Sequence, residues 1–298
     1  MRFGFLAVVA IALLASSPAS AKIRAEQLGD ASWYLHVDLG EMKKGPAGSR
    51  LYTWLQREIF SEIQKELNVD VARRIDRLTA IGIGDSGMTM ILDGPFPSSV
   101  QKSLLEWVGP AAKKSIDGKA YYRPYARSLK RDNIDVDMDD PNLSFALENR
   151  IVFTTSEALM KTVLRNNGTL PKPGDPREAL MVLSATRSLV QAGGRSDAFN
   201  AESEEWDSKL LRNTQKVALL VADLDGELGF DARLQAKEPE LAESLANVVR
   251  GLIGLSYFTE DDSAPMELLR GTRVQVENGT LRLRLTLDPD TVVSALSE

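Results

Sequence analysis

The sequence predicts an α+β fold of two related halves, each an antiparallel sheet with helices packed on one face. Three observations favour this class. Short stretches of alternating apolar and polar residues are joined in pairs by tight-turn sequences, as in antiparallel hairpins. Longer stretches between them repeat apolar residues at helical spacing. The order strand, helix, two strands, helix, strands, helix occurs twice, at an offset of about 130 to 147 residues, which indicates an internal duplication.

In the first half, this order is predicted from alternating apolar and polar residues, from helical spacing of apolar residues and from helix-capping residues. Ser156 is expected to cap the last helix, and Asn167-Gly168 to end it. The helix that follows the first strand carries an apolar residue at every fourth position. The predicted elements are a strand at 33–39, a helix at 47–67, strands at 78–84 and 88–92, a helix from Pro97, and a hairpin at 143–155.

The second half repeats the pattern with stronger turn signals. Asp225-Gly226 and Asn278-Gly279 are dipeptides typical of two-residue hairpin loops. Leu281, Leu283, Leu285 and Leu287 fall on one face of the last strand, and Arg282 and Arg284 on the other. The predicted elements are strands at 180–186, 216–224, 227–236 and within 273–287, a polar helical stretch that ends near Leu211, and helices from Pro239 and from near Pro289.

The N-terminus predicts export from the cytoplasm. Arg2 precedes an apolar stretch at 3–14, and small residues end at Ala21, where signal peptidase is expected to cut. The predicted organisation is a signal peptide at 1–21, a first half at 22–170, a linker at 171–176 and a second half at 177–298. We expect a periplasmic or secreted protein with no transmembrane anchor after cleavage, because about a dozen apolar residues are too few to cross a bilayer.

Composition excludes several chemistries. The chain has no cysteine and one histidine, so thiol catalysis, disulfide frameworks and the usual zinc or haem sites are disfavoured. Its 36 basic residues stand against 42 acidic ones, a formal net charge of −6, which disfavours nucleic acid as a partner. No glycine-rich phosphate loop or dinucleotide motif is present, and no cofactor is expected.

Two loose patterns could suggest a serine hydrolase. His36 shares a strand face with Asp38, and Gly84-Asp85-Ser86-Gly87 is similar to the nucleophile segment of trypsin-like proteases. Ser99 and Lys102 have the S-x-x-K spacing of penicillin-recognising enzymes, without the other elements of those enzymes. Capping and turn chemistry explain these serines equally well. We therefore expect no catalytic site, and keep the hydrolase as an alternative.

Residues 113–131 concentrate positive charge and tyrosines in an otherwise acidic chain. Such a segment suits an anionic ligand, such as an anionic polymer of the cell envelope. The interpretation we favour is internal pairing, in which the basic strand turns through SLKR into an acidic one. The candidate binding residues are Lys119, Tyr121, Tyr122, Arg123, Tyr125 and Arg127.

The acidic run that follows is a weak candidate for a divalent cation. Asp135, Asp137 and Asp139 alternate as at the start of a calcium loop. That geometry needs a glycine and a carboxylate where this chain has Asp140 and Ala146. Apolar residues fill the intervening positions, so a solvated acidic strand face is the favoured interpretation.

Several segments resemble an uncharacterised family of secreted bacterial proteins with a duplicated α+β module. They are SWYLHVDL, RLTAIGIG, MILDGPFPSSVQKSLL, DGKAYYRPY, the strand ALLVADL and AESLANVVRGLIGL. The resemblance covers most of the mature chain and implies the duplicated fold. It supplies no activity and no site.

Together these observations predict a non-enzymatic extracytoplasmic protein. We expect it to bind a partner, a protein or another envelope component, over a sheet face or in a cleft between the halves. The alternatives are the hydrolase and an envelope scaffold that binds an anionic polymer at residues 113–131.

Overall fold

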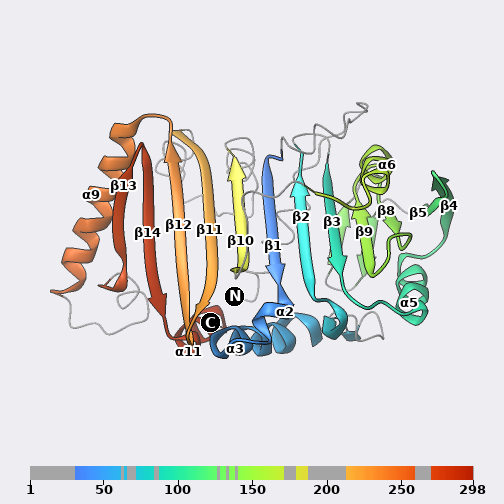
Figure 1. Ribbon diagram of the computed structural model, residues 1–298, viewed down its shortest axis with the longest axis horizontal. Helices are drawn as coiled ribbons and strands as arrows, with labels where there is room; N and C mark the ends of the chain where they lie inside the picture. Colours follow the sequence, from blue (N-terminus) through green and yellow to red (C-terminus); the bar gives the residue numbers. More distant parts are fainter. Residues whose placement is uncertain are drawn as a thin grey trace. The chain divides into compact units, whose positions relative to one another are not determined.

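A computed structural model describes most of the chain after residue 30 and confirms the α+β class, with helices and extensive antiparallel sheet (Figure 1). For residues 128–131 and 134–137 the description is limited to the backbone. The described residues are 31–61, 64–65, 72–83, 87–125, 128–131, 134–137, 140–170, 179–186, 213–258 and 270–297.

The described residues group into two compact units. One contains residues 31–40 and 54–170, and the other contains residues 41–53 and 179–297. The chain passes from one unit to the other within the short helix α2 (Leu39–Met42) and again near the end of α3 (Pro46–Leu55). The unit that holds the second half of the sequence therefore also includes a segment from the first.

In the first unit, seven described strands pair side by side, in the spatial order β1-β2-β3-β9-β8-β5-β4. Each neighbouring pair is antiparallel. The strands are β1 (Trp33–Asp38), β2 (Arg77–Gly82), β3 (Met88–Asp93), β4 (Ala111–Ile116), β5 (Lys119–Pro124), β8 (Asn142–Ser144) and β9 (Arg150–Thr154). A separate hairpin, β6 (Ser128–Arg131) and β7 (Ile134–Asp137), accompanies them, with the 3-10 turn η3 (Ala72–Arg74) and helices α5 (Ser98–Val108) and α6 (Glu157–Arg165).

Helix α6 packs on β3, β4, β8 and β9 and contributes to the core of this unit. The predicted cap is confirmed, because Ser156 Oγ accepts a hydrogen bond from the Leu159 amide at 3.3 Å. Asn167 and Gly168 have φ of 51° and 72° and end the helix as expected. The side chains that α6 buries completely are Leu159, Met160, Val163 and Leu164, and those that β9 buries completely are Ile151 and Val152.

The second unit contains five described strands, in the order β13-β14-β12-β11-β10, all antiparallel to their neighbours. Both hairpin predictions are confirmed, because both residues of Asp225-Gly226 and of Asn278-Gly279 have positive φ. The elements are β10 (Ala179–Thr186), β11 (Thr214–Leu224), β12 (Glu227–Ala236), β13 (Arg273–Glu277), β14 (Thr280–Leu287), α9 (Pro239–Ser256) and α11 (Pro289–Ser297).

Helix α9 covers one face of β12, β14 and β13 and runs along β13 (Figure 1). Ala242 and Ala246 are fully buried there and bring the helix backbone close to the sheet. The apolar side chains that meet the helix are Leu234, Ala236, Val274, Val276, Leu281 and Leu283. Because side chains alternate along a strand, the residues between them face the opposite side, away from α9.

Two local features go beyond the prediction. The helix expected at 47–67 begins at Pro46, and its described residues stay helical through Ser61 and at 64–65, but a π-helical turn, η2 (Gln56–Phe60), follows α3 (Pro46–Leu55). Residues 62–63 and 66–67 lie outside the described residues. A four-residue apolar spacing advances about 40° per step around an α-helix, and a wider turn reduces that drift. The hairpin β4–β5 had no counterpart in the predicted order, although its turn, Asp117-Gly118, is an ordinary hairpin signal.

No helix within the described part of the chain combines the length and the apolar composition needed to span a bilayer.

Candidate functional site

The hydrolase candidates lie in ordinary structural surroundings. Ser99 is exposed in the first turn of α5, and Lys102 Nζ lies 3.7 Å from Glu106, one helical turn further on. His36 is buried, and its Nδ1 lies 2.9 Å from Thr79 Oγ1. Residues 84–86, which include Ser86, are outside the described residues. Among the described residues, these candidates do not place a nucleophilic serine in contact with a base, as a serine hydrolase would need.

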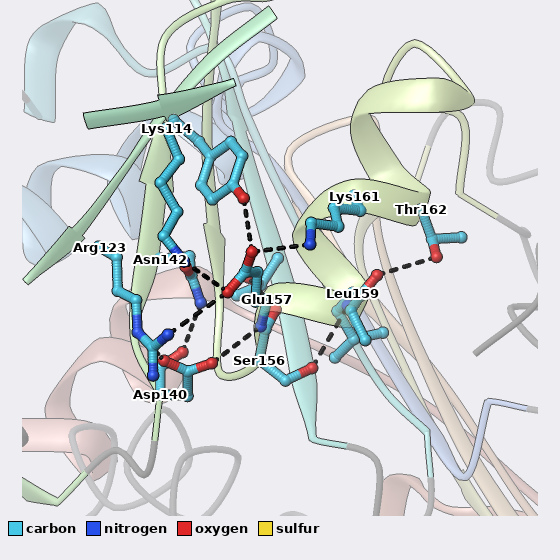
Figure 2. Close-up of polar contacts among 12 residues, drawn as sticks. Lys114, Arg123, Asp140, Asn142, Ser156, Glu157, Leu159, Lys161 and Thr162 are labelled. Carbon is cyan, nitrogen blue, oxygen red and sulfur yellow. Dashed lines mark hydrogen bonds and ion pairs between the residues drawn. The ribbon is translucent and has the colours of Figure 1, made fainter. Parts of the chain in front are cut away.

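A network of charges surrounds Glu157 in the first turn of α6 (Figure 2). Lys114 from β4 donates a hydrogen bond to its carboxylate at 2.8 Å, and Tyr121 Oη from β5 donates one at 2.7 Å. Lys161 lies one helical turn along α6, with its Nζ 2.7 Å from the carboxylate. Arg123 completes the group at 3.4 Å. Four donors from three elements therefore converge on one carboxylate.

Asp140 is the second carboxylate of this network. Its Oδ1 pairs with Arg123 Nε at 2.7 Å, and its Oδ2 accepts a hydrogen bond from the Glu157 amide at 3.2 Å. Asn142 donates to the Asp140 carbonyl at 2.6 Å. A carboxylate that accepts from an amide of the first turn stabilises the start of a helix. The network thus ties β5 and the segment before β8 to α6.

The surroundings shift two ionisations in this network. The hydrogen bonds from Lys114 and Lys161 lower the pKa of Glu157 to about 2, although its partial burial acts in the opposite direction. Burial, together with the hydrogen bond to Glu157, raises the pKa of Tyr121 to about 12. Glu157 is therefore ionised and Tyr121 is neutral at physiological pH, which keeps the phenol as a donor and the carboxylate as an acceptor.

The other candidate binding residues are spread over the unit. Lys119 donates to the Leu164 carbonyl at 2.6 Å and to the side chain of Asn167, at the far end of α6. The ring of Tyr122 lies 6.2 Å from that of Phe145, and Tyr125 is 72% exposed. Arg127 is outside the described residues. The structure brings Tyr121 and Arg123 together, and does not bring Lys119 or Tyr125 to the same place.

Lys114 and Arg123, two of the cations of residues 113–131, therefore form ion pairs within the protein. Internal pairing is the favoured interpretation of the sequence, and Asp140, at the end of the expected acidic run, pairs with Arg123, whereas Glu157 lies outside that run. Glu157 was overlooked, because an acidic residue in the first turn of a helix is common and gives no signal of its own. In the backbone register of β6 and β7, Lys130 lies opposite Asp135 and Ser128 opposite Asp137.

The proposed cation site remains a prediction. The side chains of Asp135 and Asp137 and the whole of Asp139 are outside the described residues. Within the described part of the chain, no three His, Asp or Glu side chains are grouped closely enough to hold a metal ion.

A second charged cluster lies in the other unit, on the side of β12, β14 and β13 that faces away from α9. We call it the arginine face, defined by Asp231, Arg233, Arg273, Arg282 and Arg284. The register places Arg233 opposite Arg282, and Arg284 between Asp231 and Arg273. Sequence analysis had placed Arg282 and Arg284 on one strand face but had not identified the residues across from them.

Asp231 is the acidic centre of the arginine face. The single Nε–H of Arg282 is shared between the two carboxylate oxygens, at 2.9 and 3.0 Å, and Nη2 contacts the carboxylate as well. The Nε atoms of Arg233 and Arg284 lie 3.1 and 3.6 Å from its carboxylate. Burial alone would raise the pKa of Asp231, but the bonds from Arg282 and Arg233 outweigh it and hold the pKa well below its usual range. Asp231 is therefore a permanent anion within a group of cations.

The chain matches no protein-family model, and a search of curated proteins finds no match. Among solved structures it is similar to TP0453 in crystal form IV, with 13% sequence identity over 94% of this chain and 98% of that chain, at a TM-score of 0.51. The likeness to crystal form III has 12% identity over 94% of this chain and 100% of that chain, at a TM-score of 0.49. At such low identity, the likeness to crystal form IV concerns the fold alone.

Proposed function

We propose that this chain is a non-enzymatic extracytoplasmic protein that binds a partner over an open sheet face. One observation carries the proposal. The arginine face lies opposite the face that α9 covers, and it remains accessible, with the side chains of Arg233 and Arg284 51% and 46% exposed. An exposed sheet face with clustered charge is a common form of recognition surface. The signal peptide supports the proposed periplasmic or secreted location.

Site-specific photo-cross-linking in the cells that naturally produce the protein tests this proposal. Gln275 lies on the arginine face opposite Arg282, so a photoreactive residue placed there should form a covalent adduct with the partner. The same residue at Lys102, which is exposed in the other unit, is the matched control and should form little adduct. Equal adducts at both positions, or none at Gln275, would contradict the proposal.

The order of strands supports our further proposal that the two halves arose by duplication. β1, β2 and β3 form a meander and β9 follows β3, with β8 beyond it. β10, β11 and β12 form a meander in the same way and β14 follows β12, with β13 beyond it. A helix follows the meander in each half, α5 and α9, although β4 to β7 come between α5 and β8 in the first half. A crystal structure in which these two sets of five strands fail to superpose would remove this proposal, and with it the resemblance to the secreted family with a duplicated module.

The serine hydrolase is tested separately, by a serine-reactive phosphonate probe on the purified mature chain. The binding proposal predicts no stoichiometric labelling. Modification of Ser99 that disappears in Ser99→Ala would establish the alternative and contradict the non-enzymatic assignment.

A further inference from the structure

The arginine face places like charges beside one another. Arg233 lies directly opposite Arg282, and Arg273 directly opposite Arg284, across neighbouring strands. Like charges in directly opposite positions destabilise a sheet. Asp231 contacts three of the four arginines, while Arg273 makes no ion pair with any described residue. A single carboxylate thus neutralises only part of the positive charge at the centre of this face.

The residues around this centre do not supply the missing negative charge. Glu227 and Glu277 occupy the two opposite ends of the same face, and neither pairs with a described residue. The remaining positions on this side of the three strands are small or neutral and polar: Gly229, Gln235, Gln275, Thr280 and Thr286. The centre therefore presents an excess of guanidinium groups in a chain whose formal net charge is −6.

The arrangement of the arginines fits a ligand with several anionic groups. Neighbouring strands are about 4.8 Å apart, and alternate residues along one strand are roughly 7 Å apart. Three guanidinium groups meet at Asp231, and Arg273 lies beyond Arg284 on the neighbouring strand, so the positive charge extends from that point toward β13. Asp231 occupies the Nε and Nη2 donors of Arg282 and Arg233. By contrast, the guanidinium of Arg273 makes no ion pair with a described residue and offers a planar fork of donors that matches a carboxylate, sulfate or phosphate. A linear polymer with repeated anionic groups can contact several of these guanidinium groups at once.

The three strands of the arginine face lack the features of the competing partners. Protein interfaces usually have an apolar centre with aromatic anchors, and these strands present neither on this side, although Leu220 and Leu224 of the neighbouring β11 lie at its border. Peripheral membrane binding usually adds apolar side chains that enter the bilayer to the attraction of charge. Charged and polar side chains can recognise the carboxylate and sulfate groups of acidic sugars.

We propose that the arginine face binds an acidic polysaccharide, a linear polymer that carries carboxylate or sulfate groups. This inference rests on the proposed function, because it names the ligand class of the same surface. It also differs in position from the anionic-polymer alternative at residues 113–131, where Lys114 and Arg123 contact Glu157.

The test uses the mature chain, residues 22–298, with heparin as a sulfate- and carboxylate-bearing probe and polygalacturonate as a probe with carboxylates alone. The loss variant is R233Q/R273Q/R284Q, which keeps Arg282 as the closest partner of Asp231. The matched control is K44Q/R57Q/K102Q, which removes the same charge from exposed positions elsewhere. A third variant, R233K/R273K/R284K, keeps the charge without the guanidinium fork. Thermal melts confirm that each variant is folded.

We expect the unmodified chain to bind heparin in a salt-dependent manner, and the loss variant to bind at least about tenfold more weakly. The control should bind like the unmodified chain, and the lysine variant should fall between them, because it lacks bidentate contacts. Equal loss in both triple-glutamine variants would overturn the proposal. So would stronger binding to phosphatidylglycerol vesicles than to either polymer, because that result assigns the face to a membrane.

Failure of this inference can be separated from failure of the proposed function. Cross-linking at Gln275 without arginine-dependent binding to the polymers would reject the polysaccharide and leave the binding face intact. If instead no adduct formed at Gln275, the proposed function would fail, whatever the purified chain does with heparin.

Discussion

At the scale of single residues, the polar groups of the seven-stranded unit fall into two kinds. Glu157 has several partners and a strongly lowered pKa. By contrast, Tyr34 Oη, Thr89 Oγ1 and Asn142 Oδ1 are buried without a hydrogen-bond partner. The first kind stabilises the native state only while it is charged. The second imposes a desolvation cost that nothing in the described structure offsets.

Glu157→Gln should lower the free energy of unfolding at neutral pH. It should also make that free energy depend less on pH between 4.5 and 2. The folded-state pKa of about 2 lies below the ordinary value of 4.5, so the ionised carboxylate contributes stability above pH 4.5. That contribution, up to about 3 kcal/mol, is lost as the pH falls through 4.5 toward 2. Urea unfolding at pH 7, 5, 3.5 and 2.5 measures it. Glu106→Gln, on an exposed pair, is the control, and a difference between wild type and Glu157→Gln that stays constant with pH would contradict the assignment.

Thr89→Val should leave the protein as stable or make it more stable, by up to about 1 kcal/mol, because the change removes an unpaired buried hydroxyl and keeps the shape. Thr154 lies directly opposite Thr89 on β9 and is the matched control. Its hydroxyl donates to the Ser156 carbonyl at 2.9 Å, so Thr154→Val should cost about 1 kcal/mol. Urea denaturation compares the two, and equal losses would mean that Thr89 also has a partner.

At the scale of elements, α9 shows how burial depends on what a helix packs against. Its first half buries Ala242 and Ala246 against the sheet. Its second half presents Val248, Leu252 and Leu255 to solvent, and Tyr257 and Phe258 follow them, also exposed. All of these residues are apolar, so residue type alone would predict that each is buried. Which of them are buried depends on the side of α9 that meets the sheet.

Ala246→Leu should therefore destabilise the protein by roughly 1–3 kcal/mol, because α9 has no room for three more carbons at a fully buried alanine. Leu252→Ser, only two turns along the helix, should change stability by no more than about 0.5 kcal/mol, because Leu252 is already half exposed. Denaturant unfolding monitored by circular dichroism distinguishes them. If the serine variant lost more stability than the leucine variant, the face of α9 that meets the sheet would be assigned wrongly.

At the scale of the whole molecule, the second unit depends on a segment from the first half of the sequence. The Gly48 amide donates to Asp223 Oδ2 at 2.9 Å, and Arg50 pairs with Asp290 at 2.6 Å. Asp223 also accepts from the Gly226 amide at 3.0 Å, which joins the hairpin turn to the same point. Residues 41–53 and 176–298 thus share one set of contacts although about 120 residues separate them.

Cleavage within residues 171–176, after insertion of a protease site, should therefore not release the second unit. The two fragments should elute together in size-exclusion chromatography, because residues 41–53 remain on the first fragment. Asp223→Ala combined with Arg50→Ala should weaken that association, since the two changes remove the contacts of Gly48 and Asp290. Elution of unmodified fragments as two separate species would contradict this division of the chain.

Local signals in the sequence account for most of the elements. Ser156, Asn167-Gly168, Asp225-Gly226 and Asn278-Gly279 each specify their own backbone, so the caps and turns they predict are confirmed. The helix after β1 forms where the apolar spacing predicts it, but the π-helical turn within it, Gln56–Phe60, has no signal in that spacing. The hairpin β4–β5 has no equivalent in the second half. An assignment based on a repeated order of elements therefore does not predict it.

The charged clusters could be predicted only in part, for a different reason. Tyr121 and Arg123 were singled out by composition, but their partner Glu157 is more than thirty residues away in the sequence. Arg282 and Arg284 were placed on one strand face, while Asp231 is about fifty residues away, on a neighbouring strand. Alternation gives the face of a side chain, and it does not say which strand will lie beside it.

The sequence by itself determined the class of fold, the turns, the caps and the absence of thiol chemistry, because each depends on residue type and near neighbours. Only the tertiary structure decided which charges meet at Glu157 and Asp231, and which helix joins which sheet. Those contacts depend on strand order and register, which arise when distant segments pack together and bury their apolar faces.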